Sequence, residues 1–227
     1  GWPSLSFRGG PGNPWWAQDS RSIVIEGTRG EDQWGLWVVP LDGKDPRPLA
    51  IDTPLCRNAQ IRLLSPDGSH LLLVTGEQEG DWDLWTVPIS LTQMRSTGPA
   101  VRIFGGMVPP VRTWQAVQDG WSPDGSKIVF VHNWDIWVAG TDGKNVLQLT
   151  KTPEKEGLPI WSPDGKMIVF RTQPSGSTQV GAETIHLRLH VVPASGGEAR
   201  VIADLPRAAG VGFSRYTWFP DGKEVTV

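Results

Sequence analysis

Short apolar runs rich in β-branched and aromatic residues recur along the chain, each following a polar turn. The first set lies at residues 22–26, 70–75, 127–131 and 167–171. Runs of this length and composition predict β-strands. A second set lies at residues 34–39, 82–87, 134–139 and 187–192, with bulky apolar side chains at both odd and even positions. Because successive side chains in a strand point to opposite faces, these sheets are expected to be covered on both faces.

One unit, Trp-Ser-Pro-Asp-Gly, marks a repeat. It occurs intact at residues 121–125 and 161–165, as variants at 64–68 and 218–222, and in degenerate form at 16–20. Pro presets φ for a type I turn, Asp tolerates the next position, and Gly supplies the left-handed residue that follows. Its aspartates, at positions 19, 67, 124, 164 and 221, are 40 to 57 residues apart, which brackets the roughly 40–50-residue period of propeller blades.

The repeat predicts an all-β fold, a β-propeller of four-stranded antiparallel blades whose strands we term a to d. Strand a carries the Trp of the repeat, and the two sets of runs form strands b and c. Strands d are expected at residues 48–51, 100–104, 146–150 and 199–203. The four complete blades span residues 11–54, 55–106, 107–157 and 158–206.

The remaining residues predict a fifth blade. Residues 207–227 supply strands a and b, and residues 3–8 resemble a strand d without its preceding strands. Residues 207–227 with 1–10 would then form a composite or incomplete fifth blade of a single domain covering 1–227, which would close the ring and remove free sheet edges. The alternative is an excerpt of a six- or seven-bladed propeller.

Composition narrows the classes of partner. The 21 basic and 24 acidic residues give a net charge of −3, so nucleic acid is not expected as a partner. No apolar run reaches the roughly 20 residues that span a bilayer, so membrane insertion is not expected. Cys56 is the only cysteine, which excludes an internal disulfide and leaves the compartment open. No signal peptide is visible.

The Ser-Pro-Asp-Gly turn, the Lys-Ile-Val-Phe or Met-Ile-Val-Phe strand after it, and the Asp-Leu/Ile-Trp strand resemble the TolB-type WD40-like repeat. The chain departs from it in carrying Trp where strand c often has Tyr. The resemblance implies a propeller, and it implies either a periplasmic protein-binding scaffold such as TolB or the gating propeller of a prolyl-oligopeptidase-like or tricorn-like peptidase. It implies a class of function and no particular ligand.

No residue pattern predicts catalysis, a metal site or a cofactor. The nearest match to a hydrolase elbow, residues 212–216, lacks the final Gly. His186 and His190 would lie about 13 Å apart on one strand face, too far to share an ion, so His190 is interpreted as a packed core residue. The turn aspartates offer one carboxylate each, too few for calcium, and are expected to bind their own backbone.

Thirteen Trp residues suggest sugar stacking, but ten occupy repeated positions and are therefore interpreted as core. The ten are Trp16, Trp34, Trp37, Trp82, Trp85, Trp121, Trp134, Trp137, Trp161 and Trp218. Trp2, Trp15 and Trp114 fall outside the repeat. Trp114 lies with Arg112 in the long connection 107–118, and this pair of residue types is common at binding hot spots. Packing of Trp114 under its own loop remains the alternative.

A ligand-binding face is predicted from the long connections. The insertions 76–81 and 173–184 join strands b and c, and 107–118 joins strands d and a, so all three should emerge on one face. Residues that open strand a should line the central channel there. The candidate ligand-binding residues are Asn13, Gln60, Arg112, Trp114, Gln118 and Arg215.

The sequence therefore favours a non-enzymatic scaffold that binds a protein or peptide, in the periplasm or outside the cell. A substrate-gating propeller of a larger peptidase or hydrolase is one alternative, and its catalytic activity would reside in another domain. A carbohydrate-binding propeller is another. An oligomer formed through the incomplete fifth blade stays open.

Overall fold

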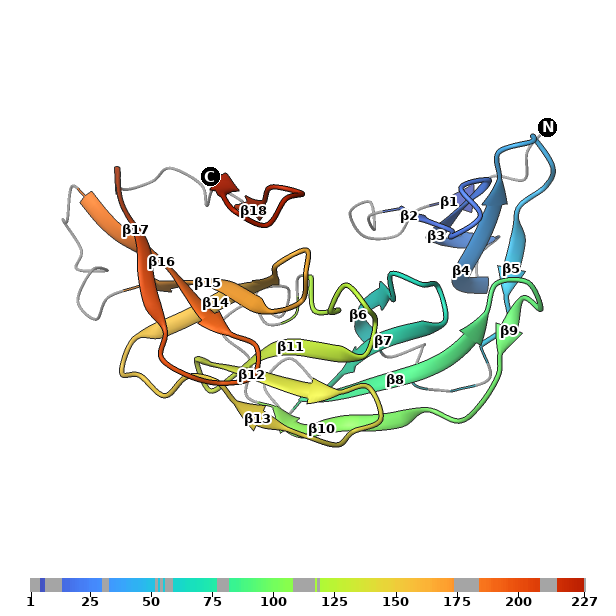
Figure 1. Cartoon of the computed structure of the whole chain (residues 1–227). Helices are drawn as coiled ribbons and strands as arrows, with labels where there is room; N and C mark the ends of the chain where they lie inside the picture. The colour runs from blue at the N-terminus through green and yellow to red at the C-terminus, as the bar shows by residue number, and fades with distance from the viewer. Residues whose placement is uncertain are drawn as a thin grey trace. The chain divides into compact units, whose positions relative to one another are not determined.

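The computed structural model describes residues 5–6, 14–29, 33–51, 53, 55, 59–76, 82–107, 117, 119–173, 184–208 and 216–226. These residues form short antiparallel strands joined by turns, with the chain running from β1 to β19 (Figure 1). The chain divides into two compact units, Gly1–Glu79 with Asp83–Arg102, and Gly80–Trp82 with Ile103–Val227. None of the described residues forms a helix with the length and apolar character that crossing a membrane requires.

The first sheet contains β1 (Leu5–Ser6), β2 (Trp15–Trp16), β3 (Ser22–Arg29), β4 (Gln33–Pro40) and β5 (Arg47–Leu49). Strand β3 pairs with β4 along its whole length, and β4 pairs with β5. Strand β2 lies along the other edge of β3. These pairings give the predicted order a-b-c-d for β2, β3, β4 and β5.

The second sheet contains β6 (Ala59–Leu64), β7 (His70–Thr75), β8 (Trp82–Ser90) and β10 (Val101–Met107), in that order across the sheet. A short strand that the sequence did not predict, β9 (Arg95–Ser96), also pairs with β8. Within the first unit, Ala50 forms a parallel bridge with Arg95 and exchanges backbone hydrogen bonds with Met94 and Ser96.

The third sheet contains β11 (Lys127–His132), β12 (Asp135–Gly140) and β13 (Leu147–Gln148). Its strand a is reduced to a single antiparallel bridge between Trp121 and Ile128. The fourth sheet has the full order β14 (Lys155–Trp161), β15 (Met167–Gln173), β16 (Thr184–Pro193) and β17 (Arg200–Ala208). Strands β18 (Thr217–Trp218) and β19 (Val225–Thr226) form a two-stranded sheet.

The repeat turn has the conformation predicted from its residues. Gly125 and Gly165 both have φ of +69°, and each donates its N–H to the Ser three residues earlier, Ser122 or Ser162, at 2.9 Å. In the degenerate first copy Ser20 takes the left-handed position with φ of +52° and donates to Ala17. The prediction of a type I turn closed by a left-handed residue is confirmed.

The sheets are buried on both faces, as the apolar pattern predicted. Leu71, Leu72, Leu73 and Val74 follow one another along β7, and each is 0% exposed. Adjacent residues of a strand point to opposite faces, so both faces of this strand are covered. Successive blades of a propeller cover each other in this way.

Trp16 was expected in the core and is instead 65% exposed. It has the same register as the other strand-a Trp residues, since Trp16 opposes Ile23 as Trp161 opposes Ile168. Trp15, which the sequence set apart from the repeat, packs partly buried against the core of the first unit. The described residues of the first unit offer Trp16 no strand a of a preceding blade to pack on, which accounts for its exposure.

Two further expectations need correction. Residues 3–8 were predicted to act as strand d of the fifth blade, but Leu5 and Ser6 pair with Arg29 and Thr28 of β3 in the first sheet. Trp134 was predicted within strand c, whereas Asn133 and Trp134 form a two-residue turn with φ of +50° and +68° before β12 begins. Positive φ at both central residues defines the type I′ hairpin turn, which suits the twist of its strands. How residues 207–227 complete a blade stays a prediction.

Candidate functional site

The strands a of the second unit are joined directly to one another. Asp119 forms a parallel bridge with Ile160 of β14. The indole Nε1 of Trp161 donates to the carbonyl of Gly120 at 3.0 Å, and that of Trp218 donates to Ile160 at 3.3 Å. Each indole therefore binds the residue immediately before the strand-a Trp of the preceding blade. This repeated bond fixes one strand a against the next.

Gly120 is suited to this contact because it has no side chain. A Cβ there would lie 2.7 Å from a methyl group of Val117 and 3.1 Å from the carbonyl of Val129. The Gly120 carbonyl accepts from both the Trp161 indole and the Val129 N–H. Any larger residue would push the strand away from both donors.

Tyr216 makes a second connection between blades. Its hydroxyl donates to the carbonyl of Leu158, and the Gly157 carbonyl lies 3.4 Å away. A register shift in β14 between Gly157 and Ile160, together with φ of +54° at Leu158, presents these carbonyls to the ring. Tyr216 is 4% exposed, and burial raises the pKa of its phenol well above the usual value. The hydroxyl thus stays protonated and serves as a donor.

The structure describes the side chain of none of the six predicted ligand-binding residues. Asn13, Arg112, Trp114, Gln118 and Arg215 lie outside the described residues, and Gln60 is placed in β6 without a described side chain. Between these positions, Val117 is fully buried, Asp119 is exposed and Tyr216 is buried. A binding role for the six residues stays a prediction.

The turn aspartates bind their own turns, as predicted. The Asp124 carboxylate accepts from the Ser122 hydroxyl at 2.6 Å and from the Ser126 N–H at 3.0 Å. These two bonds hold the pKa of the Asp124 carboxyl below its usual value. Asp164 is held in the same way by the Ser162 hydroxyl and the Lys166 N–H. In the part of the chain that the structure describes, no three His, Cys, Asp or Glu residues cluster as a metal site would require.

His190 occupies the position that Trp fills in the other blades. Its ring stacks on Phe170 with centroids 5.3 Å apart, and its Nε2 lies 3.0 Å from the Thr172 hydroxyl. Trp85 makes the equivalent bond to Thr75 at 3.1 Å. Burial lowers the pKa of the half-buried imidazole. The interpretation of His190 as a packed residue is confirmed.

Glu156 is a buried carboxyl that sequence reasoning missed. It is 1% exposed and accepts hydrogen bonds from the hydroxyls of Thr150 and Thr152 and from the N–H of Ile136. Burial raises its pKa to about 7, the hydrogen bonds oppose this shift, and the charge of Asp135 adds to it. The carboxyl joins strand c and the strand-d end of the third blade to β14. Its only sequence signal is the Thr-rich connection 150–156.

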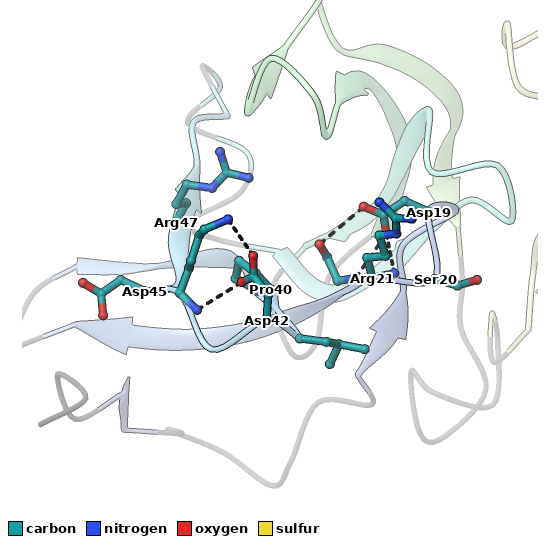
Figure 2. Close-up of a pocket in the computed structure, with 10 residues that line it drawn as sticks. Asp19, Ser20, Arg21, Pro40, Asp42, Asp45 and Arg47 are labelled. Carbon is teal, nitrogen blue, oxygen red and sulfur yellow. Dashed lines mark hydrogen bonds and ion pairs between the residues drawn. The ribbon is translucent and has the colours of Figure 1, made fainter.

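The first unit carries a charged hollow of about 680 Å³ on its first sheet, which we term the first-sheet hollow (Figure 2). Two turns form its walls, the β2–β3 turn with Asp19 and Arg21, and the β4–β5 turn with Leu41, Asp42 and Arg47. Sequence reasoning missed it because it expected a ligand at the other end of the sheets, where the long b–c and d–a connections emerge.

Repeated antiparallel sheets of one four-strand pattern, covered on both faces and joined through their strands a within the second unit, define the class of β-propellers. Residues 65–180 match the family model described as dipeptidyl peptidase IV (DPP IV) N-terminal region, and the chain belongs to this family.

Three known proteins are similar to this chain, and two of them are named TolB or putative TolB. The chain is 31% identical over 137 residues to the Tol-Pal system protein TolB of Anaeromyxobacter dehalogenans strain 2CP-C, covering 59% of this chain and 28% of that protein. It is 26% identical over 117 residues to the uncharacterized peptidase YuxL of Bacillus subtilis strain 168, covering 47% and 16%. A solved structure of putative TolB from Agrobacterium tumefaciens superposes with a TM-score of 0.55 at 20% identity, covering 91% of this chain and 69% of that one. The chain thus spans less than a third of the length of the TolB and YuxL relatives.

Proposed function

We propose that this chain is a non-enzymatic scaffold that binds a protein or peptide partner in the periplasm or outside the cell. The observation that carries the proposal is that the polar groups of the repeat form hydrogen bonds within the chain. The turn carboxylates of Asp124 and Asp164, the Trp161 indole and the Tyr216 hydroxyl all bind the chain itself. Groups engaged in this way are not available as catalysts.

Binding is then left to the parts that differ from blade to blade. The connections 76–81, 107–118 and 173–184 are such parts, and the second carries Arg112 and Trp114. Variable loops on a rigid scaffold are the usual place for recognition, and Arg and Trp are enriched at hot spots. The match to a Tol-Pal system protein supports the periplasmic part of the proposal.

A displayed peptide library, selected on the folded chain, tests this proposal. The selected peptide is expected to bind an Arg112→Ala/Trp114→Ala variant at least about tenfold more weakly, the usual size of a hot-spot loss. The matched control is Arg200→Ala/Phe219→Ala, which removes another arginine and an exposed aromatic residue and should bind normally. A selection that yields no peptide, or peptides that bind both variants equally, would contradict the proposal.

A gating propeller of a larger peptidase is the second candidate. The family model is named for the N-terminal region of dipeptidyl peptidase IV, and YuxL is named as a peptidase. The full open reading frame separates the two candidates, because a gating propeller requires a hydrolase segment in the same gene. The carbohydrate-binding alternative gains less support, since Trp37, Trp82, Trp121 and Trp161 are buried and cannot stack on a sugar.

A further inference from the structure

We propose that the first-sheet hollow is a binding site for an acidic peptide segment. It lies at the end of the first sheet where the a–b and c–d turns meet, and it does not depend on the long connections invoked above. Three observations lead to this assignment: two arginines whose side chains bind no other group of the described chain, an exposed leucine on the β4–β5 turn, and the contrast with the same positions in other blades.

Two of the three carboxylates that line the hollow, those of Asp19 and Asp42, are already engaged. Asp19 accepts from the N–H groups of Arg21 and Ser22, at 2.8 and 3.1 Å, and from the Ser22 hydroxyl. Asp42 accepts from the N–H of Lys44 and forms an ion pair with its Nζ at 2.6 Å. These bonds hold the pKa of the Asp42 carboxyl below its usual value, so it stays ionised and paired with Lys44.

Arg21 and Arg47 keep their guanidinium groups for a ligand. Both residues are exposed, and within the described part of the chain neither side chain makes a hydrogen bond or ion pair. Figure 2 shows Arg21 on the β2–β3 turn and Arg47, the first residue of β5, across the hollow from it, with Asp45 on the side away from Arg21. A guanidinium binds a carboxylate through two parallel hydrogen bonds, so this pair suits a ligand with two separated carboxylates.

The other blades use the same position differently. The residues equivalent to Arg21 are Ser69, Ser126, Lys166 and Lys223, each placed two residues after the turn aspartate. In the second, third and fourth sheets the side chain turns back onto that aspartate: Ser69 to Asp67 at 2.6 Å, Ser126 to Asp124 at 2.8 Å, and Lys166 to Asp164 at 3.6 Å. In the first blade the hydroxyl of Ser22 donates to the Asp19 carboxylate, and the side chain of Arg21 is exposed to solvent.

Leu41 is also more exposed than the residue at the equivalent position of the fourth sheet. Its N–H donates to the Arg21 carbonyl as the Ala194 N–H donates to Lys166, so the two positions correspond. Leu41 is 55% exposed, whereas Ala194 is 6% exposed. Leu41 lines the hollow together with both arginines, so its exposed side chain offers apolar contact to a residue beside the acidic positions of a peptide. The expected ligand is therefore an extended segment with an apolar residue between acidic ones.

The probe is a fluorescein-labelled peptide Glu-Glu-Leu-Glu-Glu, and its binding to the whole chain is measured by fluorescence anisotropy at low ionic strength. We expect saturable binding that weakens as salt is added, because exposed charge pairs are screened. The matched peptide Gln-Gln-Leu-Gln-Gln should not bind. Equal binding of both peptides would overturn the proposal.

Two double variants locate the site. Arg21→Gln/Arg47→Gln should weaken binding by about tenfold, the order expected for two exposed charge-assisted contacts. Lys166→Gln/Arg200→Gln removes the same charge at the equivalent positions of the fourth sheet and should leave binding unchanged. An equal loss in both variants would show attraction by overall charge alone and would overturn the assignment. Arg21→Lys/Arg47→Lys keeps the charge without the bidentate geometry and should fall between wild type and the Gln variant.

Discussion

At the scale of single residues, buried polar side chains hold neighbouring blades together. The indoles of Trp161 and Trp218 and the hydroxyl of Tyr216 all donate to backbone carbonyls of strand a in the preceding blade. The Gly120 carbonyl would keep the Val129 N–H as a donor without the Trp161 indole, so losing that indole bond costs its net value of about 1 kcal/mol. These side chains therefore stabilise the stacking of blades beyond their apolar contact.

Replacing Trp161 by Phe removes one of these bonds and keeps an aromatic ring in place. We expect a loss of about 2 kcal/mol in the free energy of unfolding, from the missing bond and the smaller ring. Chemical denaturation measures it. Trp16→Phe is the control, because Trp16 is 65% exposed and should change stability by less than about 0.5 kcal/mol. A larger loss of stability at Trp16 than at Trp161 would contradict the conclusion that Trp161, and not Trp16, holds two blades together.

Glu156 makes stability depend on pH. Its folded pKa of about 7 lies above the usual carboxyl pKa of 4.5, so the folded chain holds this proton more tightly than the unfolded chain. The contribution is therefore complete below about pH 4.5 and is lost as pH rises through about 7. Its size is on the order of 2–3 kcal/mol.

Glu156→Gln removes this titration and can keep its one carbonyl oxygen for Thr150 and Ile136, while its amide NH2 donates to the Thr152 hydroxyl. Relative to wild type, the variant should gain stability steadily as the pH is raised from 4.5 to 8, because only the wild-type chain must ionise a buried carboxyl. Denaturation midpoints across this pH range test the prediction. Glu198→Gln, at an exposed position, should follow wild type throughout. A constant difference between Glu156→Gln and wild type would mean that Glu156 does not titrate in this range.

At the scale of elements, each blade depends on the turn between strands a and b. Gly68, Gly125, Gly165 and Gly222 all have φ between +68° and +70°. Glycine adopts this conformation without the clash that a Cβ brings. Ser20 holds the same place in the first turn with φ of +52° and carries that steric cost.

Ser20→Gly should therefore stabilise the chain by roughly 0.5–1 kcal/mol, because it relieves the left-handed strain. The reciprocal change, Gly165→Ser, should destabilise by a similar amount, since a Cβ at Gly165 would meet only Pro123 at an ordinary 3.7 Å and the cost is conformational. Thermal unfolding of the two variants provides the comparison. Opposite signs are expected, and a shared sign would refute the equivalence of the two turns.

Local chemistry made most elements predictable from the sequence. Strand b of the four complete blades begins where predicted, because a turn with Asp at its third position and a following β-branched run fix it within a few residues. Trp134 was misplaced because a bulky residue with positive φ is rare, and nothing local marks Asn133-Trp134 as a type I′ turn. Residues 3–8 were misassigned because a short strand carries no signal of its partner.

The candidate sites were less predictable, for a physical reason. Glu156 is buried and hydrogen-bonded because strands c and d of one blade meet strand a of the next. The residues around Glu156 in the sequence do not indicate that contact. In the first-sheet hollow, the N–H and hydroxyl of Ser22 donate to Asp19, so the Arg21 side chain does not bind that carboxylate. Both sites arise from contacts between segments, whereas Arg112 and Trp114 were singled out by residue type alone.

At the scale of the whole molecule, the sequence repeat builds the fold, and departures from it indicate candidate binding surfaces. Four-stranded sheets of one repeat occur in both units, and the family match across residues 65–180 covers parts of both. Equivalent positions in successive blades serve as internal controls, since one position can be compared in several surroundings within one chain. Departures from the repeat, at Trp16, Arg21 and Leu41, mark the surfaces where this chain differs from its own pattern.

Hydrogen–deuterium exchange under native conditions tests most directly whether both faces of each sheet are covered. The amides of strand b, at residues 71–74, 128–131 and 168–170, should exchange slowest, because these residues are buried at 0–1% exposure on both faces. The amides of β17, where Val201 is 52% exposed, should exchange much faster. Strand-b amides that exchange as quickly as those of β17 would contradict a stack of mutually covered blades.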